Sequence, residues 1–481
     1  MVSDTLSCLF LSIPCFFISG VFGLKTNALN SVEKKAAASL ASVFGLRMLG
    51  LFLIMPVLAV YGQDYPDYSA LLVGMAIGAY GLTQAVLQIP MGWVSDRIGR
   101  RPVIIGGLLI FAAGSIVAAL ADSLVWVVVG RALQGAGAIA GAILALASDC
   151  SRDEQRPKVM AVIGMCIGLS FALALVVGPW LGGIVGMSGL FYFTAVTALL
   201  AVLLVVTVTP TPVTKTPKRD LLPVRAELKR LLITPQLIHL NVGVFVLHLV
   251  LTAWFVSLPL TLVNAGLEAE QHGWLYLPTL VLSFVVMVPL MIHAMRRQRQ
   301  LQMFRFAIAL LLIAMSVIAY FASSLWWLVV GVWIFFIGFN YLEASLPAML
   351  AQYAPAGSKG SASGIYTSFQ FLGAFVGGLV GGWLYSLHGM SGVVLFCILL
   401  LSLWLVMSFA MRAVTGMANV SLSSPGISPL QAEALAGELA ELDGVTEAVV
   451  IASEDTTYLK VQRDKFNEQG ARDMVAKYQT T

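Results

Sequence analysis

The most informative stretch of this sequence is Gly92-Trp93-Val94-Ser95-Asp96-Arg97-Ile98-Gly99-Arg100-Arg101-Pro102. It is polar and rich in arginine, and it separates two apolar runs, residues 69–94 and 103–121. Each run is long enough to cross a bilayer as a helix. A link this short makes the two helices antiparallel neighbours. Because arginine is enriched in the cytoplasmic loops of membrane proteins, we expect the link to lie in the cytoplasm.

The composition indicates a membrane protein with a soluble tail. Of the 481 residues, 59% are hydrophobic and 11% are charged, whereas a soluble globular protein carries about 25% charged residues. Residues 416–481 differ, because they hold five Lys or Arg and ten Asp or Glu. We therefore expect a basic membrane body followed by an acidic soluble domain. The five cysteines form no Cys-x-x-Cys pair, so no metal site is expected.

Twelve apolar segments follow one another along the chain, and we interpret them as membrane-spanning helices. They cover residues 36–62, 69–94, 102–121, 124–149, 158–183, 188–208, 237–264, 271–295, 303–322, 325–350, 360–387 and 391–412. Lys and Arg gather in alternate connections, which predicts that both ends of the membrane body are cytoplasmic. The predicted fold class is an all-α membrane protein of twelve transmembrane helices in two six-helix bundles, with a small α+β domain after them.

These boundaries divide the chain into five parts. They are an N-terminal extension at residues 1–35, an N-terminal bundle at 36–208, a cytoplasmic linker at 209–236, a C-terminal bundle at 237–415 and a cytoplasmic domain at 416–481. Residues 6–24 are apolar, but no Lys or Arg precedes them and no Ala-x-Ala follows, so they make a poor signal peptide. An interfacial helix, an extra membrane segment and an upstream start without a structural role remain open for residues 1–30.

The tail is predicted to fold as strand, helix, strand, strand, helix. Ser428 is a candidate N-cap with Pro429 at the first helical position, and Gly444 ends that helix. This order is a ferredoxin-like unit without its last strand, and it resembles heavy-metal-associated domains. Those domains carry Cys-x-x-Cys where this chain has Ser423-Ser424-Pro425-Gly426. We therefore expect no metal binding by the tail.

The spacing Gly-x-x-x-Asp-Arg-x-Gly-Arg-Arg resembles motif A of the major facilitator superfamily. The resemblance implies that Asp96 and Arg100 join Asp149, at the end of the fourth helix, in a charge cluster. That cluster would hold the N-terminus of the eleventh helix, near residues 360–363, in the outward-facing state. The predicted motif A latch comprises Gly92, Asp96, Arg97, Gly99, Arg100, Arg101 and Asp149.

Two further stretches resemble motifs of the same superfamily. Residues 131–137 resemble motif B, which implies a part for Arg131 in proton transfer. Residues 174–183 resemble motif C of the antiporters, although Ala174 replaces the first glycine. A kink packed on a neighbouring helix would explain the same residues. The motif C matches are Gly178, Pro179, Gly182 and Gly183.

Few ionisable side chains lie well inside the predicted helices. Insertion of an arginine there costs about 2.5–3.5 kcal/mol, so such residues usually face a polar cavity. Glu343, on the tenth helix, is the candidate proton carrier, with Arg47 or Arg131 as its counter-charge; His248 is the second candidate. A fixed Glu–Arg pair that locks the two halves is the alternative. The predicted proton-coupling and cavity residues are Glu343, Arg47, Arg131, Gln134, His248 and Asn340.

The resemblance covers the chain apart from residues 1–30, and it is to the drug/proton antiporter branch that carries a ferredoxin-like tail. It implies proton-coupled efflux of small, drug-like molecules by alternating access in the inner (plasma) membrane. A facilitator or importer of the same fold, and a membrane sensor that signals through its tail, are the alternatives. No nucleophile–base pair appears, so neither an enzyme nor a cofactor is expected. The expected partners are a small-molecule substrate, protons and the lipid bilayer, without nucleic acid, and the tail is a candidate for oligomerisation or regulation.

Overall fold

The computed structural model describes residues 29–152, 155–210, 225–355, 358–411, 417–452, 455–462 and 464–479. Most of the predicted N-terminal extension lies outside these ranges. The first described helix, α2 (Ser31–Leu53), begins five residues before the predicted first span, within the range predicted as the extension (residues 1–35). Asn30 accepts a hydrogen bond from the Glu33 backbone N–H at 2.8 Å, and the Glu33 carboxylate accepts one from the Asn30 N–H at 2.9 Å. This capping box starts the helix before the apolar run begins.

Within the described ranges, the first half of the membrane body contains seven α-helices and one 3-10 helix, and two of the predicted spans are each divided into two helices. A break at Ile54 precedes Pro56, and a break at Gly137 divides the predicted fourth span. The helices after α2 are α3 (Met55–Tyr61), η1 (Gly62–Asp64), α4 (Ala70–Ile98), α5 (Arg100–Ala119), α6 (Leu124–Ala136), α7 (Ala140–Asp149) and α8 (Arg156–Thr207).

The second half follows a short helix, α9 (Arg225–Ile233), which lies where the linker was predicted. Ten helices in the described ranges are long and apolar enough to cross a membrane. The two longest, α8 and α14, contain non-helical glycines, Gly186 and Gly389, and each glycine falls in the gap between two predicted segments. The other elements of this half are α10 (Pro235–Asn264), η2 (Ala269–Gln271), α11 (His272–Arg296), α12 (Gln300–Phe321), α13 (Leu325–Tyr353) and α14 (Lys359–Ser408).

The motif A stretch is helical, and our description of it as a loop was wrong. Helix α4 continues through Ile98, and α5 starts at Arg100, so Gly99 alone separates them. Gly99 has a φ of 102°, which glycine adopts without the penalty that a Cβ would bring. Charged residues at the end of a membrane helix do not break it, because they lie where water and headgroups can solvate them.

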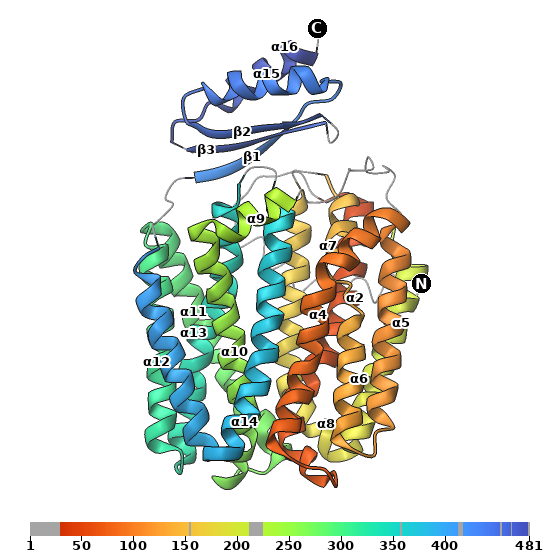
Figure 1. The fold of residues 1–481 in the computed structure, drawn as a ribbon, viewed down its shortest axis with the longest axis vertical. Helices are drawn as coiled ribbons and strands as arrows, with labels where there is room; N and C mark the ends of the chain where they lie inside the picture. The colour runs from red at the N-terminus through yellow and green to blue at the C-terminus, as the bar shows by residue number, and fades with distance from the viewer. Residues whose placement is uncertain are drawn as a thin grey trace.

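The two halves of the body pack closely along α4 and α14 (Figure 1). A Cβ on Gly74 would collide with the carbonyl oxygen of Gly378, and a Cβ on Gly78 would lie 2.8 Å from the carbonyl oxygen of Phe375. At the motif A end the contact loosens, because a Cβ on Gly92 would meet nothing within 4 Å. The halves are therefore closed against each other at the end opposite motif A.

The tail has the predicted order of elements and forms one antiparallel sheet with strand order β1-β3-β2. Ser428 caps α15 in a capping box, and Gly444 has a φ of 83° between α15 and β2. The sheet faces the membrane body, and both helices cover its other face (Figure 1). The elements are β1 (Met417–Ser423), α15 (Pro429–Ala440), β2 (Val445–Ile451), β3 (Thr456–Gln462) and α16 (Glu468–Gln479).

Lys460 in β3 connects the tail to the membrane body. Its Nζ donates hydrogen bonds to the carbonyl oxygens of Tyr353, at 3.2 Å, and Ala354, at 3.4 Å. Both carbonyls lie at the C-terminal end of α13, where the helix dipole favours a cation. Burial lowers the pKa of Lys460, and the neighbouring Glu447 carboxylate opposes this effect. The tail is thus held near the second half by this contact and by an ion pair, at 3.7 Å, between Arg230 of α9 and Glu447 of β2.

We predict that Lys460→Gln loosens the tail. Loss of a cation at a helix C-terminus costs about 1 kcal/mol, which is about a fivefold change in the docked population. Pulsed electron paramagnetic resonance between spin labels on α13 and α15 would then show a broader distribution of distances. Lys465→Gln is the matched control, because Lys465 is exposed. Equal distributions in the two variants would contradict the docking contact.

Candidate functional site

Three polar side chains from three helices of the second half meet inside the membrane body. They are His248 on α10, Glu343 on α13 and Gln370 on α14. The Gln370 Nε2 atom lies 2.8 Å from His248 Nε2 and 3.3 Å from Glu343 Oε1. Two of these residues were predicted, and the structure brings them together; Gln370 was missed.

The hydrogen bonds of His248 indicate which of its two ring nitrogens carries the hydrogen. Its Nδ1 atom lies 3.2 Å from the carbonyl oxygen of Val244. A carbonyl oxygen can only accept, so Nδ1 carries the hydrogen. The Gln370 amide nitrogen donates to Nε2, which must therefore present a lone pair. This assignment follows from the network, and it makes His248 a neutral acceptor toward the interior of the cluster.

Glu343 completes the cluster with an unsatisfied oxygen. Its Oε2 atom is buried without a hydrogen-bond partner among the described residues, and it lies 3.6 Å from His248 Nε2. Two acceptors thus face each other with no hydrogen between them. The Glu343 side chain is nevertheless 39% exposed and that of His248 is 13% exposed. One added proton would convert the pair into a donor and an acceptor.

Asn340 belongs to a separate contact. Its Nδ2 donates to Ser283 Oγ on α11 at 2.8 Å. The neighbouring residue on α13, Phe339, packs its ring edge-on against the His248 ring at a centroid distance of 6.1 Å. Aromatic packing of this kind fixes the imidazole without supplying another polar partner. Asn340 therefore ties α13 to α11 rather than to Glu343.

Arg47, on α2, is fully buried in the first half. Its NH2 donates to Gln84 Oε1 at 2.9 Å and to the carbonyl oxygen of Gly137 at 3.0 Å. The rings of Tyr80 and Phe111 lie 5.7 and 5.6 Å from its guanidinium carbon. Its Nε and NH1 atoms have no hydrogen-bond partner in the described parts of the chain.

Arg131, on α6, is also satisfied within the first half. Its Nε donates to the carbonyl oxygen of Ala76 at 3.1 Å, and its NH1 to Gln134 Oε1 at 2.8 Å. Gln134 in turn donates to Ser115 Oγ at 2.7 Å. No described hydrogen bond or ion pair joins Arg47 or Arg131 to Glu343 in this conformation, because their described partners are amide and carbonyl oxygens of the first half. A counter-charge role for either arginine stays a prediction. Gln84 and Gln88 lie one turn apart in an apolar segment. They are the sequence feature that could have indicated a polar partner for Arg47 within the first half.

The motif A charges form a cluster within the first half. The Arg100 guanidinium contacts the Asp96 carboxylate, lies 3.3 Å from Asp149 Oδ2 and donates to Ser95 Oγ at 2.8 Å. No described hydrogen bond or ion pair joins this cluster to residues 360–363 of α14. The predicted charge cluster is therefore present, whereas the predicted contact with α14 is absent in this conformation.

The other motif A arginines are also engaged by the protein. Arg101 NH2 donates to the carbonyl oxygens of Val205, at 2.6 Å, and Thr209, at 2.9 Å. Arg97 stacks on the Trp93 ring at 3.7 Å from its centroid. Arg101 thus ties the start of α5 to the end of α8, which is a structural task.

The motif C residues pack α8 against the first helix. A Cβ on Gly178 would lie 2.7 Å from the carbonyl oxygen of Leu53, and one on Gly182 would lie 3.0 Å from a Val57 methyl group. A Cβ on Gly183 would collide with the Glu270 side chain. Pro179 lies inside α8. This arrangement agrees with a kinked helix packed on its neighbour, and an antiport role for motif C stays a prediction.

The geometry defines the class of protein. Two helical halves enclose buried polar clusters whose side chains come from separate helices, as in secondary transporters. Within the described ranges, no group of three His, Cys, Asp or Glu side chains could hold a metal ion. The chain belongs to the Major Facilitator Superfamily, whose profile matches residues 40–378. It is a membrane transporter and not an enzyme.

Named relatives agree with this assignment. The chain is 41% identical over 435 residues to the inner membrane transport protein YajR of Escherichia coli K12, covering 90% of this chain and 96% of that protein. It is 26% identical to the multidrug resistance protein MdtH of Aeromonas salmonicida, over 70% of this chain and 83% of that one. A bacterial homologue of the human lysosomal transporter Spinster, solved in an inward-facing and occupied conformation, shares the fold with a TM-score of 0.66 at 13% identity, over 79% and 97% of the two chains.

Proposed function

We propose that this protein is a proton-coupled exporter of small molecules in the inner membrane. The observation that carries the proposal is the buried Oε2 of Glu343, which has no hydrogen-bond partner among the described residues and lies 3.6 Å from His248 Nε2. A carboxyl group and an imidazole can each bind and release a proton. The names of YajR and MdtH support an inner-membrane location and efflux of drug-like molecules.

The proposed architecture has twelve crossings. Ten helices can span the membrane, and Gly186 and Gly389 divide two of them, which adds two more crossings. The arginine-rich motif A end is then cytoplasmic, as are both ends of the membrane body. The tail, with strand order β1-β3-β2, fits a ferredoxin-like unit without its last strand.

This orientation makes the described conformation inward-facing. The halves are closed along Gly74, Gly78 and Gly378, at the end opposite motif A. In the proposed cycle Glu343 is protonated from the outside and releases its proton to the cytoplasm. Substrate is carried in the opposite direction by the same rocking of the two halves. Entry of one proton supplies about 2.3 kcal/mol per 100 mV of membrane potential.

In the outward-facing state, motif A is proposed to hold α14. Closure at the motif A end would extend the register in which Ser368 Oγ donates to the Ala85 carbonyl oxygen at 3.1 Å. On α14, Ser361 lies seven residues before Ser368. On α4, Asp96 lies eleven residues after Ala85, and both residues are displaced toward the motif A end. The Asp96 carboxylate would then approach the N-terminal turn of α14, where the helix dipole favours an anion.

We expect Asp96→Asn to weaken the outward-facing state without unfolding the protein. An anion at a helix N-terminus contributes about 0.3–1 kcal/mol, so the outward-facing population should fall about two- to fivefold. Labelling of a cysteine placed on the periplasmic side of the body should slow accordingly. Asp122→Asn is the control, because Asp122 is exposed at the opposite end. Unchanged labelling in the Asp96 variant would contradict the latch.

The proposed function is tested on purified protein in liposomes. A thermal-shift screen of small molecules first identifies a stabilising substrate. Its uphill movement is then measured with an imposed proton gradient, before and after an uncoupler is added. Export predicts accumulation that the uncoupler collapses, whereas a facilitator would move substrate only downhill. A sensor would bind the ligand without moving it.

A further inference from the structure

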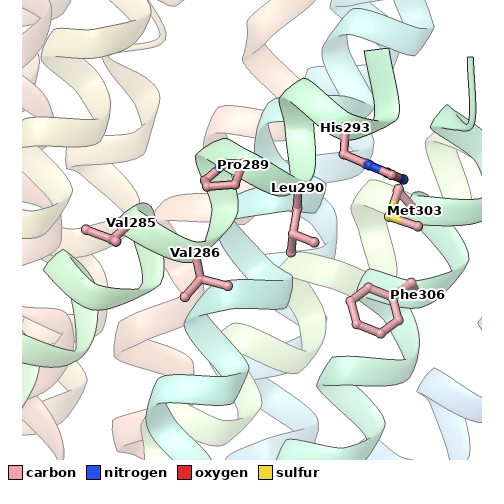
Figure 2. A pocket seen from close by; sticks show the side chains of 7 residues that line it. All are labelled: Val285, Val286, Pro289, Leu290, His293, Met303 and Phe306. Atoms are coloured by element: carbon pink, nitrogen blue, oxygen red, sulfur yellow. The ribbon is translucent and has the colours of Figure 1, made fainter. Parts of the chain in front are cut away.

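A surface groove of 660 Å³ lies between α11 and α12, away from the polar clusters described above. Its walls are apolar: Val286, Pro289 and Leu290 come from α11, and Met303 and Phe306 come from α12 (Figure 2). The groove lies along helices that are apolar enough to span the membrane. Its occupant in a bilayer is therefore hydrocarbon.

One end of the groove is polar. His293 lines it and lies beside Met303 (Figure 2). The turn that joins α11 to α12 follows within one helical turn, and it carries Arg296, Arg297 and Arg299. All three arginines are exposed, and none of their side chains has a hydrogen bond or ion pair in the described parts of the chain. Three cationic residues thus follow, within six positions along the chain, the histidine that lines the polar end of the groove.

The first turn of α12 adds to this positive end. Arg299 is its N-cap, and no side chain caps the helix. The first backbone N–H groups of α12 therefore point toward the same turn and carry the positive end of the helix dipole. This feature agrees with the arginines, which provide the larger charge.

These arginines have no structural task, unlike their counterparts elsewhere in the body. In the first half, Arg100 is bound to two aspartates, and Arg101 donates to the end of α8. In the second half, Arg305 takes the place of Arg101, because its Nε donates to the Ser408 carbonyl oxygen at the end of α14 at 3.3 Å. Arg296 and Arg297 are additional to the arginines that make these structural contacts.

We infer that the groove between α11 and α12 binds an anionic phospholipid, with one acyl chain against Val286 and Leu290 and the phosphate at Arg296, Arg297 and Arg299. Basic pockets between membrane helices bind lipid headgroups of this kind. An apolar channel that ends in cations matches a molecule with a hydrocarbon tail and an anionic head. The inference does not depend on the proposed proton coupling or on the direction of transport.

The test is native mass spectrometry of the full chain, titrated with phosphatidylglycerol and with phosphatidylcholine of the same acyl chains. Phosphatidylglycerol should be retained at least tenfold better. The triple variant Arg296→Gln, Arg297→Gln, Arg299→Gln should lose this preference, with an affinity loss on the order of a hundredfold at about 1 kcal/mol for each arginine. Lys34→Gln, Lys35→Gln is the matched control, because it removes exposed cations at the start of α2.

A second variant tests the acyl chain. Val286→Trp should fill the groove and weaken phosphatidylglycerol while leaving all the cations in place. Glycerol phosphate, which has the head without the tail, should not compete. The inference is overturned if the two phospholipids are retained equally, if the triple variant keeps its preference, or if glycerol phosphate competes as well as the lipid. Thermal melts of each variant, matched to the unaltered chain, establish that folding is intact.

Discussion

Glu343→Gln is expected to abolish uphill transport while leaving substrate binding and downhill exchange intact. Glutamine keeps the shape of the side chain but cannot take up and release a proton. One proton entering at 100 mV is worth about 2.3 kcal/mol, which corresponds to a substrate gradient of about fiftyfold. That gradient should fall to unity in the variant. Proteoliposomes with an imposed gradient, together with counterflow of labelled substrate, measure both activities.

Two further variants make this result specific. Glu268→Gln removes an exposed carboxylate at the opposite end of the body and should leave the gradient unchanged. His248→Asn removes the acceptor that faces Glu343 and should slow coupled transport without abolishing it. If Glu343→Gln still builds a gradient that an uncoupler collapses, Glu343 is not the carrier. If coupling is then lost in His248→Asn, the carrier is His248.

The sequence pointed to Glu343 and His248 but not to Gln370, which contacts both. Glu343 and His248 could be found because ionisable groups are costly inside apolar segments. Gln370 is uncharged, so it does not stand out in such a segment. Its position beside both groups depends on how α14 is rotated against α10 and α13, which hydropathy does not encode. Arg47 was paired with Glu343 by charge alone, whereas in the structure its NH2 group donates to Gln84 and to the carbonyl oxygen of Gly137.

For motif A, the sequence predicted which charged residues associate but not the backbone conformation that brings them together. Its charged residues and their association with Asp149 were predicted through the family resemblance, and the structure contains that cluster. The helical state of Asp96 was not predicted, because a polar stretch between apolar runs reads as a loop. Only the φ of 102° at Gly99 separates the two helices. The conformational state, closed at the end opposite motif A, depends on contacts between distant halves, which a single sequence does not show.

Gly74→Val is expected to shift the protein strongly toward the outward-facing state. The added Cβ would collide with the backbone carbonyl oxygen of Gly378, which no side-chain rotation can relieve. Overpacking of this kind costs about 1–3 kcal/mol, so the closed end should open with a population change of about five- to 150-fold. Labelling of a cysteine on the periplasmic side should rise, and net export should fall because the cycle loses its inward-facing step.

Gly106→Val separates this contact from the general cost of valine in a helix. A Cβ on Gly106 would meet nothing within 4 Å, so that variant carries the change in helix propensity without the collision. Labelling that is equal in the two variants would show that the contact between α4 and α14 does not set the conformational balance. Because Asp96→Asn acts in the opposite direction at the far end of α4, combining it with Gly74→Val should return the labelling toward that of the unaltered chain. The two residues lie far apart along α4, so their effects on the conformational free energy should add.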